Sequence, residues 1–222
     1  MPWHDEAVVC RLASLAAVLV FGLAFAASAA AGPRDEKKHL TRADTALARH
    51  ALLRPSDVGL DWTAVNVPLS SSPRCAGYNP DFSRFTMTGR ASSGFMNGGG
   101  SAIASGVEVY PSRAQASGDW AEGVRPGFLS CFASKLVRQF AKSGLAVSVA
   151  SKRSSRSPQL GMRSLAWHIV FRLSVQGRSV HYYVDLYGFQ VNRELGSVSF
   201  QSLGKPIARQ AALARLVASR LG

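Results

Sequence analysis

The feature that most constrains the fold is an alternation of apolar and polar side chains between residues 165 and 201. Side chains on a β-strand point alternately to its two faces, so apolar residues at every second position indicate a strand with one buried face. The alternation predicts three consecutive strands, over residues 166–175, 178–187 and 196–200. Strands that follow one another through short connections pair antiparallel, so this stretch predicts an antiparallel sheet.

A two-residue turn at Gln176-Gly177 sets the register of the first two strands. In this register apolar residues meet apolar residues at four positions: Leu173 with Val180, Phe171 with Tyr182, Ile169 with Val184, and Trp167 with Leu186. A shift by one residue would move one of the apolar sets to the opposite face of the sheet. The sequence therefore predicts both the hairpin and its register.

The same register gathers polar side chains on the other face of the hairpin. Arg172 falls opposite His181, and His168 falls opposite Asp185, with Tyr183 between them. We interpret these five residues as a candidate ligand-contact surface, because histidine changes its charge near neutral pH and the group combines hydrogen-bond donors with acceptors. The alternative is a solvated sheet face whose cross-strand pairs each add a small stabilisation.

The N-terminus contains an apolar run, residues 12–32, that ends in small residues. An apolar segment followed by an Ala-x-Ala site is typical of a secretory signal peptide, and Ala27-Ser28-Ala29 is the predicted cleavage site. Because the run is long enough to cross a bilayer, an uncleaved N-terminal anchor is the alternative. We therefore predict a signal segment over residues 1–29 and a single secreted or extracytoplasmic domain over residues 30–222.

Two of the three cysteines, Cys75 and Cys131, lie in the predicted exported domain. An even number of cysteines in an exported chain predicts a disulfide, and two unpaired buried thiols are the alternative. The sequence contains neither a CxxC pair nor an HExxH motif. We therefore expect no metal site and no cofactor.

The formal net charge is +13, and it is distributed unevenly. Residues 123–222 contain 15 Lys and Arg against two acidic residues, whereas residues 32–122 contain 10 basic and 9 acidic residues. This asymmetry predicts an anionic partner, which for an exported protein is a membrane head group or a cell-wall polymer. Nucleic acid is not expected, because the sequence contains no motif that reads it. A basic stretch predicted to be a loop supplies the candidate contacts: Lys152, Arg153 and Arg156.

Local patterns predict the remaining elements. Helical spacing of apolar residues predicts helices over residues 34–53, 112–120, 128–142 and from 204 to the C-terminus. Further strands are expected over residues 61–65, 84–91, 102–110 and 145–150, and the glycine-rich segment 92–101 is expected to be a flexible hairpin loop. Runs of consecutive strands argue against βαβ units and favour an α+β fold, in which helices pack on an antiparallel sheet.

Several segments carry a resemblance to known proteins: residues 51–59 (ALLRPSDVG) with Trp62, residues 107–116 (VEVYPSRAQA), the two cysteines, and the closing three strands and helix. This pattern resembles a group of actinobacterial exported domains that includes LpqN-type lipoproteins and the extracytoplasmic sensor domains of some Ser/Thr protein kinases. The resemblance implies a PsbP-like α/β/α sandwich, a pairing of Cys75 with Cys131, and a role in binding rather than catalysis. It implies no particular site residues.

These observations favour an exported, non-catalytic domain that binds a small or lipid-like ligand, or a partner, in a cleft between sheet and helices. One alternative is a basic surface protein that binds anionic membrane or cell-wall polymer. The second alternative is a hydrolase in which His168 or His181 acts with Asp185 and a nearby serine, although the sequence contains no GxSxG motif.

Overall fold

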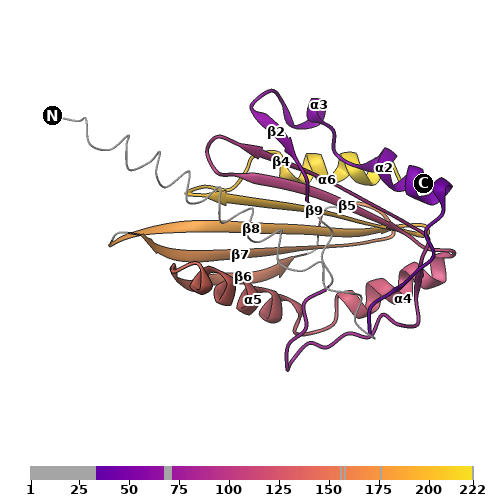
Figure 1. The fold of residues 1–222 in the computed structure, drawn as a ribbon, viewed down its shortest axis with the longest axis horizontal. Helices are drawn as coiled ribbons and strands as arrows, with labels where there is room; N and C mark the ends of the chain where they lie inside the picture. Colours follow the sequence, from indigo (N-terminus) through magenta and orange to yellow (C-terminus); the bar gives the residue numbers. More distant parts are fainter. Residues whose placement is uncertain (1–33, 68–71, 156, 158, 176, 222) are drawn as a thin grey trace.

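The computed structural model describes residues 34–67, 72–155, 157, 159–175 and 177–221. The predicted signal segment and Arg156 lie outside these residues. The described part forms an α+β fold, in which helices cover both faces of a seven-stranded antiparallel sheet (Figure 1). This architecture confirms the fold class that the runs of consecutive strands predicted.

The sheet has the strand order β2–β4–β5–β9–β8–β7–β6, and every neighbouring pair is antiparallel. The strands in that order are β2 (Trp62–Val65), β4 (Gly89–Asn97), β5 (Ala102–Val109), β9 (Glu194–Leu203), β8 (Arg178–Val191), β7 (Arg163–Val175) and β6 (Ala146–Ser155). A separate two-residue parallel pair joins β1 (Lys37–Lys38) to β3 (Thr86–Met87). The central strand β9 therefore joins a hairpin from the first half of the chain to the long hairpin of the second half.

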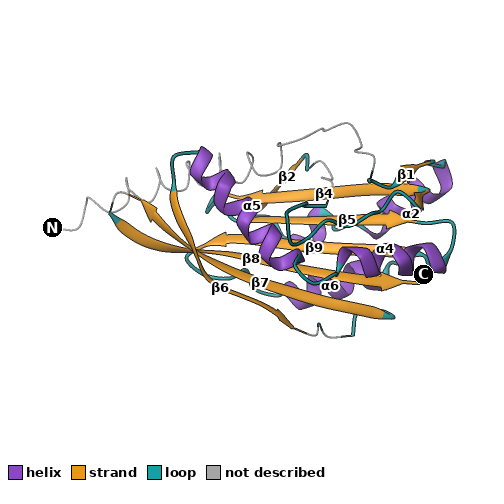
Figure 2. Ribbon diagram, turned by 90° about the horizontal axis from the view of Figure 1, so that it is seen from below, coloured by secondary structure: helices purple, strands orange, loops and turns teal. Residues whose placement is uncertain are grey.

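The helices form two layers, one on each side of the sheet. The short helix α3 (Pro55–Val58) lies with α2 (Arg42–Ala51) and α6 (Gln210–Ser219) on the upper side in Figure 1. The helices α4 (Arg113–Gly123) and α5 (Phe128–Lys142) lie on the lower side, and Figure 2 shows them in front of the strands. None of the described helices combines the length and the apolarity needed to cross a membrane.

The predicted hairpin is present with the predicted register. β7 pairs with β8 so that Phe171 faces Tyr182 and Ile169 faces Val184. The polar pairs also form as predicted, with His168 opposite Asp185. Both strands extend beyond the predicted limits, so the hairpin runs the length of the sheet (Figure 1).

Two helices begin later in the chain than their apolar spacing predicted. The helix predicted over residues 34–53 begins at Arg42, because the Thr41 hydroxyl accepts a hydrogen bond from the Asp44 amide (3.1 Å) and caps the helix there. The preceding residues are extended instead, and the Lys37 amide donates to the Phe85 carbonyl. The C-terminal helix, predicted from residue 204, begins at residue 210.

Two segments predicted as loops are strands. Residues 152–155 belong to β6 and pair with β7, so the basic stretch is not the solvated loop that its composition suggested. Residues 92–97 continue β4, where Gly94 pairs with Ala104, and only residues 98–101 form the turn. In both places pairing with a neighbouring strand overrides the local composition, since strand propensity depends strongly on context.

The hydrophobic core has a large cluster on each side of the sheet. One cluster packs α2 and α6 against residues of the central strands such as Phe189 and Phe200. The other packs α5 against the hairpin, where the Phe140 ring meets the rings of Phe171 and Tyr182 at centroid distances of 5.9 and 5.4 Å. Helix α5 is therefore held against β7 and β8 by aromatic contacts.

A disulfide joins Cys75 to Cys131 and confirms the predicted pairing. The bridge closes a segment with a sequence separation of 56 residues. It fastens the first turn of α5 to the loop that precedes β3. The covalent link and the aromatic contacts of Phe140 thus fix α5 at both of its ends.

Removal of the bridge is expected to destabilise the whole fold. The Cys75→Ala/Cys131→Ala variant should lose about 4 kcal/mol of unfolding free energy, because the unfolded chain regains the entropy of an open loop of this length. Urea unfolding of the wild type and the variant measures the difference. Wild-type protein unfolded in a reducing agent should show the same loss, and an unchanged midpoint in both cases would contradict the expectation.

Candidate functional site

A pocket of about 440 Å³ lies between the sheet and the two lower helices. One face of β4, β5, β9 and β8 forms its floor, and the helices α4 and α5 form its roof. The roof residues are mainly aromatic and aliphatic: Trp120, Val124, Phe128, Phe132 and Leu136. A volume of this size, with a largely apolar lining, is typical of sites for small molecules.

The pocket extends down to the backbone of the sheet because the middle of the sheet carries small residues on this face. The register aligns Ser92, Gly106, Ser197 and Gly188 in one row across four strands. The next row contains Gly94, Ala104, Ser199 and Leu186. Apart from Leu186, these side chains are too short to reach the helix layer. Val67 packs over Gly94, and space remains between the helices and the other small residues of the two rows.

Gly188 lets two indole rings pack directly on the sheet. A β-carbon at this position would lie 3.3 Å from ring atoms of both Trp120 and Trp167, which is closer than an ordinary van der Waals contact. Both tryptophans line the pocket, one from the roof and one from β7. The pocket therefore has an aromatic wall whose fluorescence reports on its contents.

One end of the pocket is apolar. Met96, Ala102 and Val184 line it from the sheet. Gln201 lies in the same row, and its side-chain oxygen accepts a hydrogen bond of 2.7 Å from the Tyr182 hydroxyl. Because that polar atom already has a partner, this end presents mainly hydrocarbon to an occupant.

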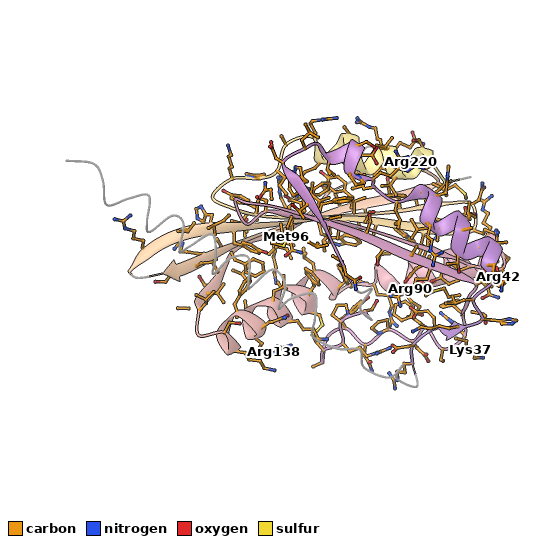
Figure 3. The ribbon with its side chains drawn as sticks, turned by 45° about the horizontal axis from the view of Figure 1, so that its top comes forward. Lys37, Arg42, Arg90, Met96, Arg138 and Arg220 are labelled. Carbon is orange, nitrogen blue, oxygen red and sulfur yellow. A yellow bond between two sulfur atoms is a disulfide. The ribbon has the colours of Figure 1, made fainter. Side chains whose placement is uncertain are left out.

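The other end of the pocket is polar. Arg90 and Glu108 face each other across β4 and β5, with 3.4 Å between the Arg90 Nε and a Glu108 carboxylate oxygen. Figure 3 shows Arg90 on β4, at the end of the sheet near α4. Asp119 approaches from α4, lines the pocket and is only 5% exposed. Its Oδ2 atom is buried and has no hydrogen-bond partner in the structure.

Asp119 is surrounded by groups that disfavour its negative charge. Burial, and then the nearby carboxylates of Glu108 and Glu36, raise the pKa of its carboxyl to about 8. The neighbouring Tyr110 hydroxyl lowers the pKa but does not offset these effects. At neutral pH the Asp119 carboxyl therefore carries a proton in the empty pocket, and it can donate a hydrogen bond as well as accept one.

The polar cluster predicted on the hairpin lies on the opposite face of the sheet from this pocket. Asp185 is buried and His168 is half-buried, and their Oδ1 and Nδ1 atoms are 2.7 Å apart. Arg172 and His181 are exposed two rows further along, and Tyr183, in the row between, is half-buried with its ring 6.2 Å from that of His181. The structure thus brings two of the five candidates into direct contact with each other.

His168 and Asp185 belong to a longer chain of hydrogen bonds. The Ser155 hydroxyl oxygen lies 3.1 Å from His168 Nε2. The second Asp185 oxygen accepts a hydrogen bond of 2.7 Å from the Gln210 amide at the start of α6. The order of serine, histidine and aspartate is that of serine hydrolases, and the same bonds also fasten edge strand β6 to β7, β8 and α6.

The candidate contacts for an anionic surface lie along β6. Lys152 and Arg153 are exposed on this edge strand, and Arg156 lies outside the described residues. The Lys152 ammonium donates a hydrogen bond of 2.8 Å to the Ser130 hydroxyl of α5. Arg138 is exposed on the side of α5 away from the sheet (Figure 3). A role for these cations in binding a membrane or a wall polymer stays a prediction.

The sequence predicted a cleft between sheet and helices, but none of the candidate ligand-contact residues lines this pocket. A signal was present in the small residues at alternate positions of three strands: Ser92, Gly94, Ala104, Gly106, Ser197 and Ser199. Asp119 is one of two acidic residues in α4, and nothing in its local sequence distinguishes it as buried. Within the described residues, no cluster of three or more His, Cys, Asp or Glu side chains is arranged to hold a metal ion.

No protein-family model matches the chain, and no curated protein matches it in sequence. The resemblance to actinobacterial exported domains therefore stays a prediction. The function has to be inferred from the geometry of the chain itself.

The raised pKa of Asp119 predicts a dependence of stability on pH. Between the usual aspartate pKa, about 4, and the raised value, the folded state binds one more proton than the unfolded state, so wild-type stability falls as pH increases. The Asp119→Asn variant lacks this group. Relative to the variant, wild-type protein should lose up to about 1.4 kcal/mol of unfolding free energy per pH unit between pH 5 and 8.

Urea unfolding at several pH values measures this difference. Glu36 and Glu194 also have raised pKa values, but both groups are present in both proteins, so the comparison isolates Asp119. Asp61→Asn, at an exposed position, is the matched control, and its stability should follow that of the wild type. Parallel curves for the wild type and Asp119→Asn would show that Asp119 is already ionised at pH 5.

Proposed function

We propose that this protein is an exported, non-catalytic binding domain whose pocket between the sheet and α4 and α5 holds a small, lipid-like ligand. The observation that carries the proposal is the pocket itself, with its floor of small residues, aromatic roof and single polar end. The disulfide supports an oxidising compartment, since such bonds persist mainly outside the cytosol.

The packing of the pocket supports an occupant. Protein interiors are normally close-packed, whereas this pocket opens to solvent and its apolar lining atoms lack packing contacts there. Here a row of glycine, alanine and serine keeps a volume of about 440 Å³ open beneath aromatic side chains. An apolar ligand would recover those contacts and remove its own hydrocarbon surface from water, at about 25 cal/mol per Å².

The contacts that hold α4 and α5 in place also favour binding. Helix α5 is held by the Cys75–Cys131 bridge at its start and by the Phe140 contacts near its end. Helix α4 is capped by Ser112, whose hydroxyl accepts a hydrogen bond from the Gln115 amide. A site whose walls are already in place loses little conformational entropy when the ligand enters.

Filling the pocket is expected to abolish binding. In Ala104→Phe the added ring would occupy the middle of the floor. The neutral dye N-phenyl-1-naphthylamine is the probe, and its fluorescence enhancement reports its binding to an apolar site. The variant should bind it at least about tenfold more weakly than the wild type, a loss of about 1.4 kcal/mol.

Ala64→Phe places the same side chain at an exposed position of β2 and is the matched control. It should bind the dye as the wild type does, and thermal unfolding should show that both variants are folded. Equal dye affinity in the wild type and Ala104→Phe would place the binding site elsewhere and remove the support for this proposal.

A hydrolase is the second candidate function, and the geometry of Ser155, His168 and Asp185 favours it. In such a reaction the serine oxygen forms a bond to an ester carbonyl carbon while its proton moves to His168 Nε2. That proton then passes to the leaving alcohol, and attack by water on the acyl-enzyme releases the acid and restores the serine. Asp185, which is bonded to Nδ1, would hold the imidazole in the required orientation.

A fluorophosphonate reagent separates the catalytic role from a purely structural one. An activated Ser155 becomes covalently labelled, and Ser155→Ala or His168→Gln prevents the labelling. Ser154→Ala, at the neighbouring exposed serine, is the control and should leave the labelling unchanged. If these hydrogen bonds only hold β6 in place, wild-type protein stays unlabelled, and Ser155→Ala loses about 1 kcal/mol of stability.

A further inference from the structure

We infer that the polar end of the pocket binds a protonated amine, so that the ligand is an amphipathic amine with an apolar body. This inference rests on the proposed function and adds the chemical class of the head group. It depends on one buried carboxyl oxygen without a partner and on the balance of charges around it.

The Asp119 carboxyl supplies the acceptor. Its residue is 95% buried at the pocket wall, and the Oδ2 atom has no hydrogen-bond partner. Buried polar atoms in native proteins almost always have a partner, so a polar ligand group at this end of the pocket would supply the bond that Asp119 lacks. An ammonium group carries three N–H donors and no acceptor, and it therefore suits the carboxyl of a buried aspartate at the pocket wall.

The charges at this end favour a cationic head group. Arg90 is the one cation among the described residues that line the pocket, and Glu108 already lies against it. Glu36, in the segment before β1, adds a further carboxyl near Glu108, and its pKa is raised by burial and then by that neighbour. Glu122, on the same helix as Asp119, forms ion pairs with Arg84 and Arg125.

Glu108 and Glu36 both lie near the Arg90 guanidinium, and Asp119 lies near the carboxylates of Glu108 and Glu36. The remaining neighbour is Tyr110, which is fully buried, and its hydroxyl donates to a Glu108 oxygen at 3.4 Å. A carboxylate or phosphate head group would add another negative charge beside the acidic groups. An ammonium head group would balance the ionised form of Asp119.

Binding of an ammonium group is coupled to the release of a proton. The carboxyl of Asp119 holds a proton in the empty pocket at neutral pH, and this proton leaves to solvent when the cation takes its place. Affinity for the amine therefore rises with pH until Asp119 is ionised in the free protein. An alcohol with the same chain is neutral, so its binding releases no proton and its affinity does not depend on pH.

The positive net charge of the protein works against the binding of an amine. The chain carries +13, so long-range electrostatics attract an anionic amphiphile and repel a cationic one. A preference for the amine can then arise only from groups close to the head group. The exposed cations of β6 and α5 would instead favour the anionic probe, so the sign of the preference distinguishes the two sites.

The experiment compares three probes with the same ten-carbon chain: decylamine, 1-decanol and decanoate. Tryptophan fluorescence follows binding at pH 6 and pH 8, because Trp120 and Trp167 line the pocket. At pH 8 decylamine should bind at least about tenfold more tightly than either other probe, a difference of about 1.4 kcal/mol. Its affinity should fall several-fold at pH 6, while that of 1-decanol stays constant.

The Asp119→Asn variant should lose the preference for the amine and keep its affinity for 1-decanol. The Asp61→Asn control, at an exposed position, should behave as the wild type. If Asp119→Asn does not fold, the pH dependence of the wild type decides the question. Amine binding that is independent of pH, or a preference that survives Asp119→Asn, would overturn the inference.

The outcomes also distinguish this inference from the proposed function. Equal binding of all three probes, blocked by Ala104→Phe, supports the apolar pocket and rejects the amine head group. Tighter binding of decanoate than of decylamine, blocked by the same variant, likewise rejects the head group alone. Absence of binding by every probe rejects both the pocket as a binding site and its head-group specificity.

Discussion

The antiparallel register of β4, β5, β9 and β8 is the constraint on which the rest of the structure depends. Because side chains alternate between faces, this register decides which residues meet the lower helices and which meet α2 and α6. It aligns small residues into adjoining rows on the lower face, while Phe189, Val198 and Phe200 fill the core on the upper face. A close-packed core and an open pocket therefore lie back to back on the same four strands.

Asp119 differs electrostatically from the aspartates that are paired with arginine. Asp44 and Asp57 hold arginines in paired hydrogen bonds, with Arg193 at 2.6 and 3.1 Å and Arg220 at 2.8 Å, and these bonds lower their pKa values. Both pairs fasten helices to the rest of the fold. Asp119 has no such arginine partner, and burial raises its pKa instead. The paired carboxylates stabilise the fold. The carboxyl of Asp119, whose pKa is raised, costs stability above the usual pKa of aspartate, and it lines the pocket.

The two faces of the hairpin support different chemistry. On the upper face, His168 and Asp185 link to Ser155 and Gln210, so this group is continuous with the contacts that hold α6 and edge strand β6. On the lower face, Trp167 of the same strand lines the pocket beside Trp120. A ligand in the pocket would therefore contact the strand that carries His168 on its opposite side, with the sheet between the two sites.

The sequence by itself determined the elements whose pattern is local. Alternation over residues 165–201 was sufficient for β7, β8 and the register between them, helical spacing for the limits of α5, and cysteine number for the disulfide. Tertiary structure alone decided the rest. Residues 152–155 became strand through pairing with β7, and the Thr41 cap displaced the start of α2. The pocket, and the burial of Asp119 at its end, are formed by segments that lie far apart in the chain. The solvation and packing of such a site depend on residues that are distant in sequence, so the local sequence pattern does not predict them.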